Sequence, residues 1–320
     1  MRNINSEVII ILCSYLCVGE DTKPFETVEW SKIAEILMEN SLTPKDLIDM
    51  KREDLEKYFS SEVAQRILTL FKRSGSITFE IQKLKENGIE IVTRADENYP
   101  RILKRKLKKN CPPLFYYVGD ISLCNKKSIG IVGSRNCDKD DEEFTKNLVK
   151  KIIDNNYAIV SGGARGIDSI ASETALENNG IIIEYLSDSL LKKIKKRNII
   201  NAIRNKQLLL LSSSKPDAGF NVGMAMARNK YIYSQSEATI VIKSDYKKGG
   251  SWNGAVEAMK KGYCKVVCRE NENSKGNIEL INNGAMGVSS DWNLEFEKAT
   301  LKEEKIEKKV DTSKQLDLFS

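Results

Sequence analysis

The sequence predicts an α/β protein in which a doubly wound, mostly parallel sheet follows a small all-helical domain and precedes a charged tail. Between residues 128 and 283, short apolar runs alternate with segments of helical spacing, a pattern typical of a parallel sheet covered by helices on both faces. The first 75 residues show helical spacing only, whereas residues 298–310 are rich in Lys and Glu. We therefore expect three parts, at residues 1–75, 76–295 and 296–320.

Composition excludes several kinds of chemistry. The 320 residues include no histidine, which excludes Ser-His-Asp and Cys-His triads, His-ligated zinc and imidazole general-base catalysis. The seven cysteines form no CxxC pair and lie in apolar surroundings, so they predict buried thiols in a reducing compartment, with no metal and no cofactor. The net charge of +6, from 51 basic and 45 acidic residues, permits a nucleic-acid partner.

The N-terminal apolar run predicts neither a membrane span nor a secretion signal. Val8–Cys17 is too short to cross a bilayer and lacks a basic flank followed by a cleavage site. We therefore expect a cytoplasmic protein that makes no contact with a membrane.

The predicted helical domain carries no visible catalytic chemistry. Thr43 before Pro44, and Ser60-Ser61 before Glu62, have the residue types that start helices. We interpret the domain as a packing or protein-contact module. Its predicted helices are Glu7–Leu16, Trp30–Met38, Pro44–Met50 and Ala64–Phe71.

The sheet region begins after a helix that ends near Gly88. A strand at Glu90–Thr93, a helix at Ile102–Leu107 and a second strand starting at Leu114 follow. The later predicted strands are Ile129–Val132, Tyr157–Val160, Ile181–Tyr185, Gln207–Leu211, Ala238–Ile242 and Lys265–Cys268. The predicted helices between them are Asp141–Ile153, a helix from Ile167, Ser187–Arg204, Val222–Tyr233, Trp252–Lys261 and Asn277–Asn283.

Two glycine-containing loops predict an anion site. Gly133, Ser134 and Arg135 follow the strand at Ile129–Val132. The other loop follows the next strand and contains Ser161, Gly162, Gly163, Arg165 and Gly166. Backbone N–H groups without side-chain bulk, at the start of a helix, favour phosphate, and Arg adds a permanent positive charge. The alternative is that the glycines only form tight turns.

Two further loops are expected at the same edge of the sheet. One carries Arg228, Asn229 and Lys230, and the other carries Lys248, Gly249, Gly250, Ser251 and Trp252. Lysine and arginine contacts to phosphate, with a ring for base stacking, are suited to single-stranded nucleic acid. Core packing is the alternative for Trp252. The basic run Lys192–Arg197 is interpreted as the solvated face of a helix.

These residues resemble, in the same order, motifs of the bacterial DprA/Smf DNA-processing proteins. The motifs are Asp96–Pro100, Pro112–Asp120, Gly133–Arg135, Ser161–Asp168 with Ala175-Leu176, Arg228–Lys230, Gly249–Ser251 and Asn283–Ala285. The resemblance implies an extended Rossmann-like fold that binds single-stranded DNA, usually as a dimer, and that loads the RecA recombinase during natural transformation.

Carried over by position, the resemblance assigns roles to the loop residues. Arg135 and the Arg165 loop would hold phosphates, Arg228, Lys230 and Lys248 would extend that track, and Ser161–Gly163 would supply backbone donors. The chain departs from the family in having Ser172 where a histidine is usual, Lys230 where arginine is common, and a Met-Ala-Met-Ala run in place of Phe-Pro.

The tail carries a separate signal. Gln315, Leu316, Asp317, Leu318 and Phe319 resemble the motif with which bacterial DNA polymerases and repair proteins bind the sliding clamp. Two apolar anchors on an accessible terminus suit docking into a pocket. The alternative is a frayed tail that folds back on the domain.

The sequence therefore predicts a non-enzymatic protein that binds single-stranded DNA and protects it or hands it to recombination machinery such as RecA. One alternative is a nucleotide phosphoribohydrolase of similar fold, with Glu257 as the acid and Arg135 or Arg228 on phosphate. A second alternative is a nucleotide sensor that signals through the helical domain.

Overall fold

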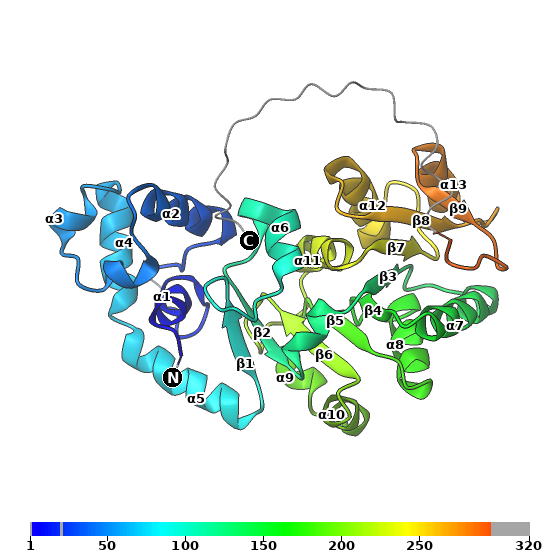
Figure 1. Cartoon of the computed structure of the whole chain (residues 1–320), viewed down its shortest axis with the longest axis horizontal. Coiled ribbons are helices and arrows are strands. Elements are labelled where there is room, and N and C mark those ends of the chain that lie inside the picture. Colours follow the sequence, from blue (N-terminus) through cyan, green and yellow to red (C-terminus); the bar gives the residue numbers. More distant parts are fainter. Residues whose placement is uncertain (1, 20–21, 296–320) are drawn as a thin grey trace. The chain divides into compact units, whose positions relative to one another are not determined.

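The computed structural model describes residues 2–19 and 22–295, and they form two compact units. Unit 1 comprises Met1–Asn125 and Ile182–Arg228, and unit 2 comprises Lys126–Ile181 and Asn229–Ser320. The domain boundaries predicted after residues 75 and 295 stay a prediction. The helices and strands of both units are labelled in Figure 1.

Unit 1 combines the N-terminal helices with four strands. The helices are α1 Ile4–Cys13, α2 Thr27–Glu39, α3 Arg52–Leu55, α4 Ser61–Phe71 and α5 Ser74–Glu86, with a 3-10 turn, η1, at Pro44–Leu47. The strands are ordered β1 Glu90–Thr93, β2 Leu114–Val118, β6 Leu208–Ser212 and β5 Ile182–Tyr185. The β1–β2 and β2–β6 pairs are antiparallel, whereas β5 and β6 are parallel, with Ile182 opposite Leu208.

Hydrogen bonds of Arg73 hold the end of α1 to the segment between α4 and α5. The Arg73 guanidinium donates to three carbonyls at the end of α1, those of Ile11 at 3.0 Å, Ser14 at 2.9 Å and Leu16 at 3.0 Å. These bonds satisfy carbonyls that a helix end leaves unpaired. The predicted helix starts are confirmed: the Ser60 hydroxyl caps α4, and Thr43 forms a capping box with Asp46.

The remaining elements of unit 1 connect its strands. They are α6 Arg101–Leu107, η2 Lys108–Asn110, η3 Ile121–Asn125, α9 Leu190–Lys193 and α10 Arg197–Arg204. The single helix predicted at Ser187–Arg204 is therefore wrong. Leu190 and Ile199 are both buried, yet nine residues at about 100° each would place them on opposite faces of one helix. The break returns both side chains to the core.

Unit 2 contains five parallel strands that are buried along most of their length. Their order is β4 Ala158–Ser161, β3 Ser128–Val132, β7 Ala238–Val241, β8 Lys265–Arg269 and β9 Met286–Val288. The helices are α7 Lys139–Asp154, α8 Ile167–Glu177, α12 Gly249–Lys261 and α13 Lys275–Asn282, and α11 Val222–Gln235 runs across the division between the units. The mixed α/β fold with mostly parallel strands is thus confirmed.

Several predicted boundaries differ from the structure. The predicted helix at Pro44–Met50 is only one 3-10 turn, strand β9 was not predicted, and α12 begins at Gly249 instead of Trp252. Four of the seven cysteines are buried as expected, whereas Cys17, Cys137 and Cys264 are partly exposed, and none forms a disulfide. Across the described residues, no helix combines the length and apolar character needed to cross a membrane.

Candidate functional site

Three loops meet at one edge of the unit 2 sheet. Strand β3 is parallel to β4 on one side and to β7 on the other, with Gly130 opposite both Val160 and Thr239. Because parallel neighbours end at the same edge, the loops after β3, β4 and β7 lie next to one another there. The sequence predicts an anion site in the first two of these loops and a nucleic-acid contact in the third.

The loops after β3 and β4 are in direct contact. Gly166 has φ +78°, and a Cβ atom at this position would lie 2.5 Å from the carbonyl oxygen of Ser134. The Ile167 N–H donates to that oxygen at 3.3 Å, and a Cβ on Gly133 would lie 2.5 Å from the Ile167 side chain. Glycine is therefore required at both positions for the close approach of the two backbones.

This contact brings together the two predicted arginines. Arg135 directly follows Ser134 in the first loop and Arg165 directly precedes Gly166 in the second, and both side chains are exposed to solvent. Ser161 is buried, and its hydroxyl donates to the Ile131 carbonyl at 2.9 Å, so that hydroxyl ties β4 to β3. The edge thus presents two guanidinium groups on a rigid glycine framework.

Helix α12 adds a positive helix terminus at the same edge. Lys248 is its N-cap residue and is exposed, and the Lys248 side chain makes no capping hydrogen bond. Gly249, Gly250 and Ser251 form the first turn, in which backbone N–H groups have no partner within the helix. The predicted glycine loop is therefore a helix N-terminus, which carries about half a positive charge.

Asn229 holds this helix start in place. Its side-chain amide donates to the Gly250 carbonyl at 2.9 Å, and a Cβ on Gly250 would lie 2.6 Å from that amide nitrogen. Arg228, Asn229 and Lys230 lie within α11, so their predicted placement in a loop is wrong. Arg228 and Asn229 are 7% and 9% exposed, and Lys230 is half-buried, with its ammonium 5.4 Å from the centre of the Tyr231 ring. Phosphate contacts by these residues, as by the other predicted site residues, stay a prediction.

Trp252 belongs to the core. Its side chain is 8% exposed, and its ring meets the Tyr246 ring edge-on at 5.0 Å between centroids. The packing alternative is therefore correct for this residue, because a ring stacked on a base must present an open face.

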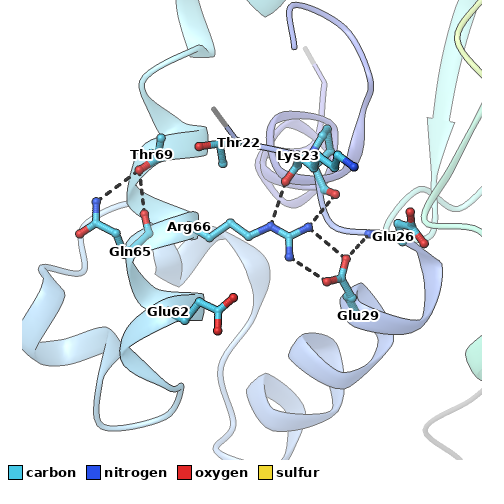
Figure 2. Close-up of a pocket in the computed structure, with 9 residues that line it drawn as sticks. Thr22, Lys23, Glu26, Glu29, Glu62, Gln65, Arg66 and Thr69 are labelled. Atoms are coloured by element: carbon cyan, nitrogen blue, oxygen red, sulfur yellow. Dashed lines mark hydrogen bonds and ion pairs between the residues drawn. The ribbon is translucent and has the colours of Figure 1, made fainter. Parts of the chain in front are cut away.

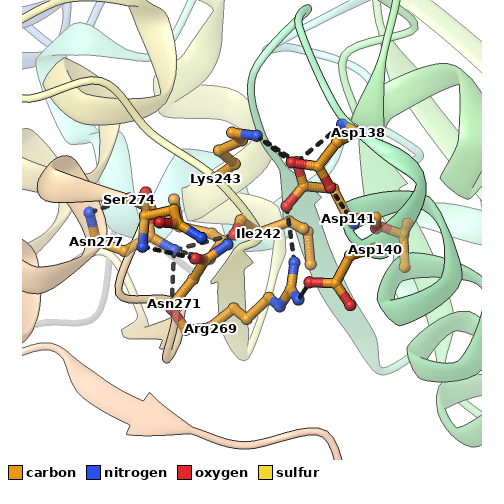
Figure 3. A network of polar contacts seen from close by, with 12 residues as sticks. Asp138, Asp140, Asp141, Ile242, Lys243, Arg269, Asn271, Ser274 and Asn277 are labelled. Atoms are coloured by element: carbon orange, nitrogen blue, oxygen red, sulfur yellow. Dashed lines mark hydrogen bonds and ion pairs between the residues drawn. The ribbon is translucent and has the colours of Figure 1, made fainter.

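A buried ion network, which the sequence analysis missed, occupies the start of α7 (Figure 3). The fully buried Asp141 carboxylate accepts from Lys243 Nζ at 2.6 Å and from Arg269 Nη1 at 2.7 Å. Lys243 also donates to Asp138 at 2.8 Å, and Arg269 to Asp140. Lys243 lowers the pKa of Asp138 to about 2. The acidic run at residues 138–141, at a helix start, is the sequence signal for this network.

The network shows that α7 is not an anion site. Asp138 and Asp141 form a capping box, so carboxylates of the chain itself already bind the N–H groups at the start of the helix. A phosphate at this position would meet three aspartates.

A cavity of about 710 Å³ in unit 1 is also unsuited to phosphate (Figure 2). Three glutamates line it, at positions 26, 29 and 62. Its Arg66 guanidinium donates to both Glu29 oxygens, at 2.7 and 3.0 Å, and to the carbonyls of Lys23 and Pro24. Arg66 lowers the pKa of Glu29, so the cavity keeps its negative charge near neutral pH.

The described residues contain no cluster of three or more Cys, Asp or Glu side chains that could hold a metal ion. The predicted clamp-binding residues at 315–319 lie outside the described part of the chain.

The parallel sheet of unit 2, with glycine loops and cations at its carboxyl edge, defines a Rossmann-like α/β protein. A family model, DNA recombination-mediator protein A, matches residues 90–295. The chain belongs to this family, and the predicted membership of the DprA/Smf group is confirmed.

Two curated relatives illustrate the similarity. The DNA processing protein DprA of Bacillus subtilis (strain 168) is 26% identical over 270 residues, which cover 79% of this chain and 89% of the relative. The protein Smf of Synechocystis is 27% identical over 232 residues, which cover 67% of this chain but only 55% of the relative.

Two solved structures are similar. DNA processing protein A from Streptococcus pneumoniae shares the fold, with a TM-score of 0.70 and 22% identity over 90% of this chain and 95% of that chain. DNA processing protein A from Helicobacter pylori, whose structure concerns its single-stranded DNA binding mode, has a TM-score of 0.52 and 27% identity. That match covers 62% of this chain and 90% of the other.

Proposed function

We propose that the edge of unit 2 binds the phosphates of single-stranded DNA and that the protein is a non-catalytic DNA-processing factor. The observation that carries the proposal is the contact between Gly166 and the Ser134 carbonyl, because it joins the two arginine-bearing loops. The described similarity to the Helicobacter pylori protein supports the choice of ligand.

Charge and geometry favour a strand. Arg135, Arg165 and Lys248 are exposed in the segments that follow three neighbouring parallel strands. Neighbouring strands of a sheet are about 4.8 Å apart, so the three loops present positive groups along a line. A line of cations fits consecutive phosphates of a strand, whereas a closed pocket fits one mononucleotide.

The test is fluorescence anisotropy of a labelled oligo-dT of about 20 nucleotides, titrated at several salt concentrations. We expect Arg135→Ala and Arg165→Ala each to weaken binding and to flatten the plot of log affinity against log salt by about 0.7, because each loses one phosphate contact. Arg197→Ala, which removes an exposed arginine of unit 1, is the matched control. Equal binding by all three variants, or no binding by the parent at low salt, would contradict the proposal.

The position of Glu257 supports the non-catalytic assignment over a phosphoribohydrolase. Glu257 is the ninth residue of α12, about 12 Å along the helix from its first residue at 1.5 Å per residue. Its carboxylate accepts from the Tyr263 hydroxyl at 3.3 Å. Incubation with nucleoside monophosphates should release no free base. Saturation by a mononucleotide, with no gain in affinity on lengthening, would favour a nucleotide sensor instead.

The finer parts of the function extend this proposal. We propose that the bound strand is protected or handed to RecA, by a homodimer in the cytoplasm, and that Gln315–Phe319 binds the sliding clamp. Faster RecA assembly on a strand coated with single-strand-binding protein would support handover. Sedimentation of the full chain tests the dimer. No saturable binding of the isolated tail peptide to clamp would remove the clamp hypothesis.

A further inference from the structure

Unit 1 carries a basic surface that the sequence analysis did not assign. Residues 94–109 contain seven Lys or Arg residues but only two acidic ones. Most of these cations lie on α6 and the 3-10 turn η2 that follows it (Figure 1). We call this the α6 surface, and it comprises Arg94, Arg101, Lys104, Arg105, Lys106, Lys108 and Lys109.

Helix geometry turns these cations outward. Leu103 and Leu107 are 0% and 2% exposed and anchor α6 in the core of unit 1. Arg101 and Arg105 are four residues apart, so they share a face, and each is about 200° around the helix from the leucine two positions later. Both arginines are exposed, as is Lys109 on η2.

Hydrogen bonds fix the end of this surface to its surroundings. The Ser31 hydroxyl on α2 donates to the Lys109 carbonyl at 2.8 Å, and Arg94 Nη1 donates to the Ser31 hydroxyl at 3.3 Å. Just beyond η2, the Tyr99 hydroxyl donates to the Pro112 carbonyl at 2.7 Å. The backbone that carries the cations is therefore held by side chains from α2 and from the loop that precedes α6.

Five of these cations have no acidic partner among the described residues. In the part of the chain that the structure describes, Arg101, Lys104, Arg105, Lys108 and Lys109 form no ion pair. Burial, followed by the positive charges of Arg94 and Arg101, lowers the pKa of Lys104. Like charges held close together in this way favour a polyanionic partner.

We propose that the α6 surface is a second nucleic-acid contact, which binds the phosphodiester backbone of a strand. The proposal rests on the proposed function, since the strand is the same ligand. From residue 101 to residue 109 the surface extends about 12 Å, which is long enough to contact neighbouring phosphates of one strand. No large apolar side chain is exposed anywhere between residues 80 and 219, a range that includes the α6 surface. This disfavours insertion of the surface into a lipid layer.

The test compares strands of two lengths. The variant Arg101→Gln/Arg105→Gln/Lys109→Gln removes three exposed cations and keeps the anchoring leucines and the bonded backbone. Its matched control, Lys195→Gln/Lys196→Gln/Arg197→Gln, removes three exposed cations from another basic run of unit 1. Anisotropy with oligo-dT of about 6 and about 40 nucleotides is measured for both variants, for Arg135→Ala and for the parent, at several salt concentrations.

We expect the α6 variant to lose affinity severalfold for the long strand alone. The slope of log affinity against log salt should become shallower by about 2, since three single-strand contacts contribute about 0.7 each. The control should match the parent at both lengths. Arg135→Ala should weaken both lengths.

Three results would overturn the proposal. One is a salt dependence of long-strand binding that is the same for the α6 variant and the parent. Another is an equal loss of affinity in the control variant, which would show that net charge alone explains the effect. The third is loss of binding to vesicles containing phosphatidylserine, or to poly-glutamate, with strand binding intact. Failure of the proposed function is seen separately, as parental binding of the short strand by Arg135→Ala.

Discussion

Replacing Gly166 with alanine separates the two arginine-bearing loops. Gly166 has φ +78° and ψ −130°, a backbone region that is essentially restricted to glycine, where another residue costs about 1–3 kcal/mol. The added Cβ would also lie 2.5 Å from the Ser134 carbonyl oxygen and 2.8 Å from Arg135 Cα. Both atoms belong to backbone, so a side-chain rotation cannot relieve the contact.

The expected magnitude follows from these two effects. Carbon contacts relax to about 3.5 Å, so the loops must move apart by about 1 Å. Strain and repacking together should lower the free energy of unfolding of unit 2 by about 2–4 kcal/mol. The displaced Arg135 should weaken strand binding about tenfold, which corresponds to about 1.4 kcal/mol.

Urea denaturation followed by circular dichroism measures the stability change, and anisotropy with oligo-dT measures the binding change. Gly262→Ala is the matched control, because Gly262 also has positive φ, +66°, but nothing lies within 4 Å of its added Cβ. It should cost about 1 kcal/mol and leave binding unchanged. If Gly166→Ala behaves like Gly262→Ala in both assays, the loops do not depend on this contact and the reasoning is refuted.

Three further changes test individual side chains. Lys193→Met should lower the free energy of unfolding by about 3 kcal/mol, because Lys193 Nζ lies 2.9 Å from the buried Glu184 carboxylate. Lys192 is exposed, so Lys192→Met should have little effect in the same urea titration. Trp252→Leu should destabilise unit 2 by about 1–3 kcal/mol yet keep parental strand affinity by anisotropy, since the ring is buried. The pKa of Asp138 is lowered to about 2, so its ionised form stabilises the fold above about pH 3.9, and this stabilisation is lost as pH falls toward 2. Asp138→Asn should therefore lose less free energy of unfolding than the parent when both are titrated with acid over that range.

Local patterns predicted most of the strands and the position of the two glycine loops at one edge of the sheet. Strands β3 and β4 are apolar runs that stop at glycine, and burial on both faces makes such runs stand out in a sequence. The two loops could be placed together because parallel strands end at the same edge. The basic run of α6 was also visible, but periodicity alone did not show that its leucines face the core and its arginines face solvent.

Other features depend on partners that are distant in the sequence. Arg269 contacts Asp141 across 128 positions, so the acidic run at residues 138–141 marks a helix start but does not indicate which cations pair with it. The break between α9 and α10 depends on where the core lies, because Leu190 and Ile199 are both buried although one continuous helix would place them on opposite faces. For Trp252, the choice between core and base stacking was decided by burial, since its side chain is only 8% exposed, and burial follows from the tertiary fold.

The helices that follow β3, β4 and β7 differ in the acidic residues of their first turns, and this difference selects the phosphate position among the three loops. Helix α7 has three acidic residues in its first turn, and α8 has Asp168, which accepts from the Ala164 N–H at 3.4 Å, whereas α12 has none. The start of α12 should therefore take a phosphate first.

A carboxylate placed there should act in opposite directions on stability and binding. Ser251→Glu puts a negative charge in the first turn of α12, which should raise stability by about 0.3–1 kcal/mol while excluding a phosphate from the same N–H groups. Asn198→Glu, in the acid-free first turn of α10, is the control and should only stabilise. Urea titration and oligo-dT anisotropy are measured together, and parental strand affinity in Ser251→Glu would show that the phosphates lie elsewhere. If Ser251→Glu is more stable than the parent and no longer binds a strand, the loss of binding comes from the blocked phosphate position. Damage to the fold would instead lower both the stability and the strand affinity.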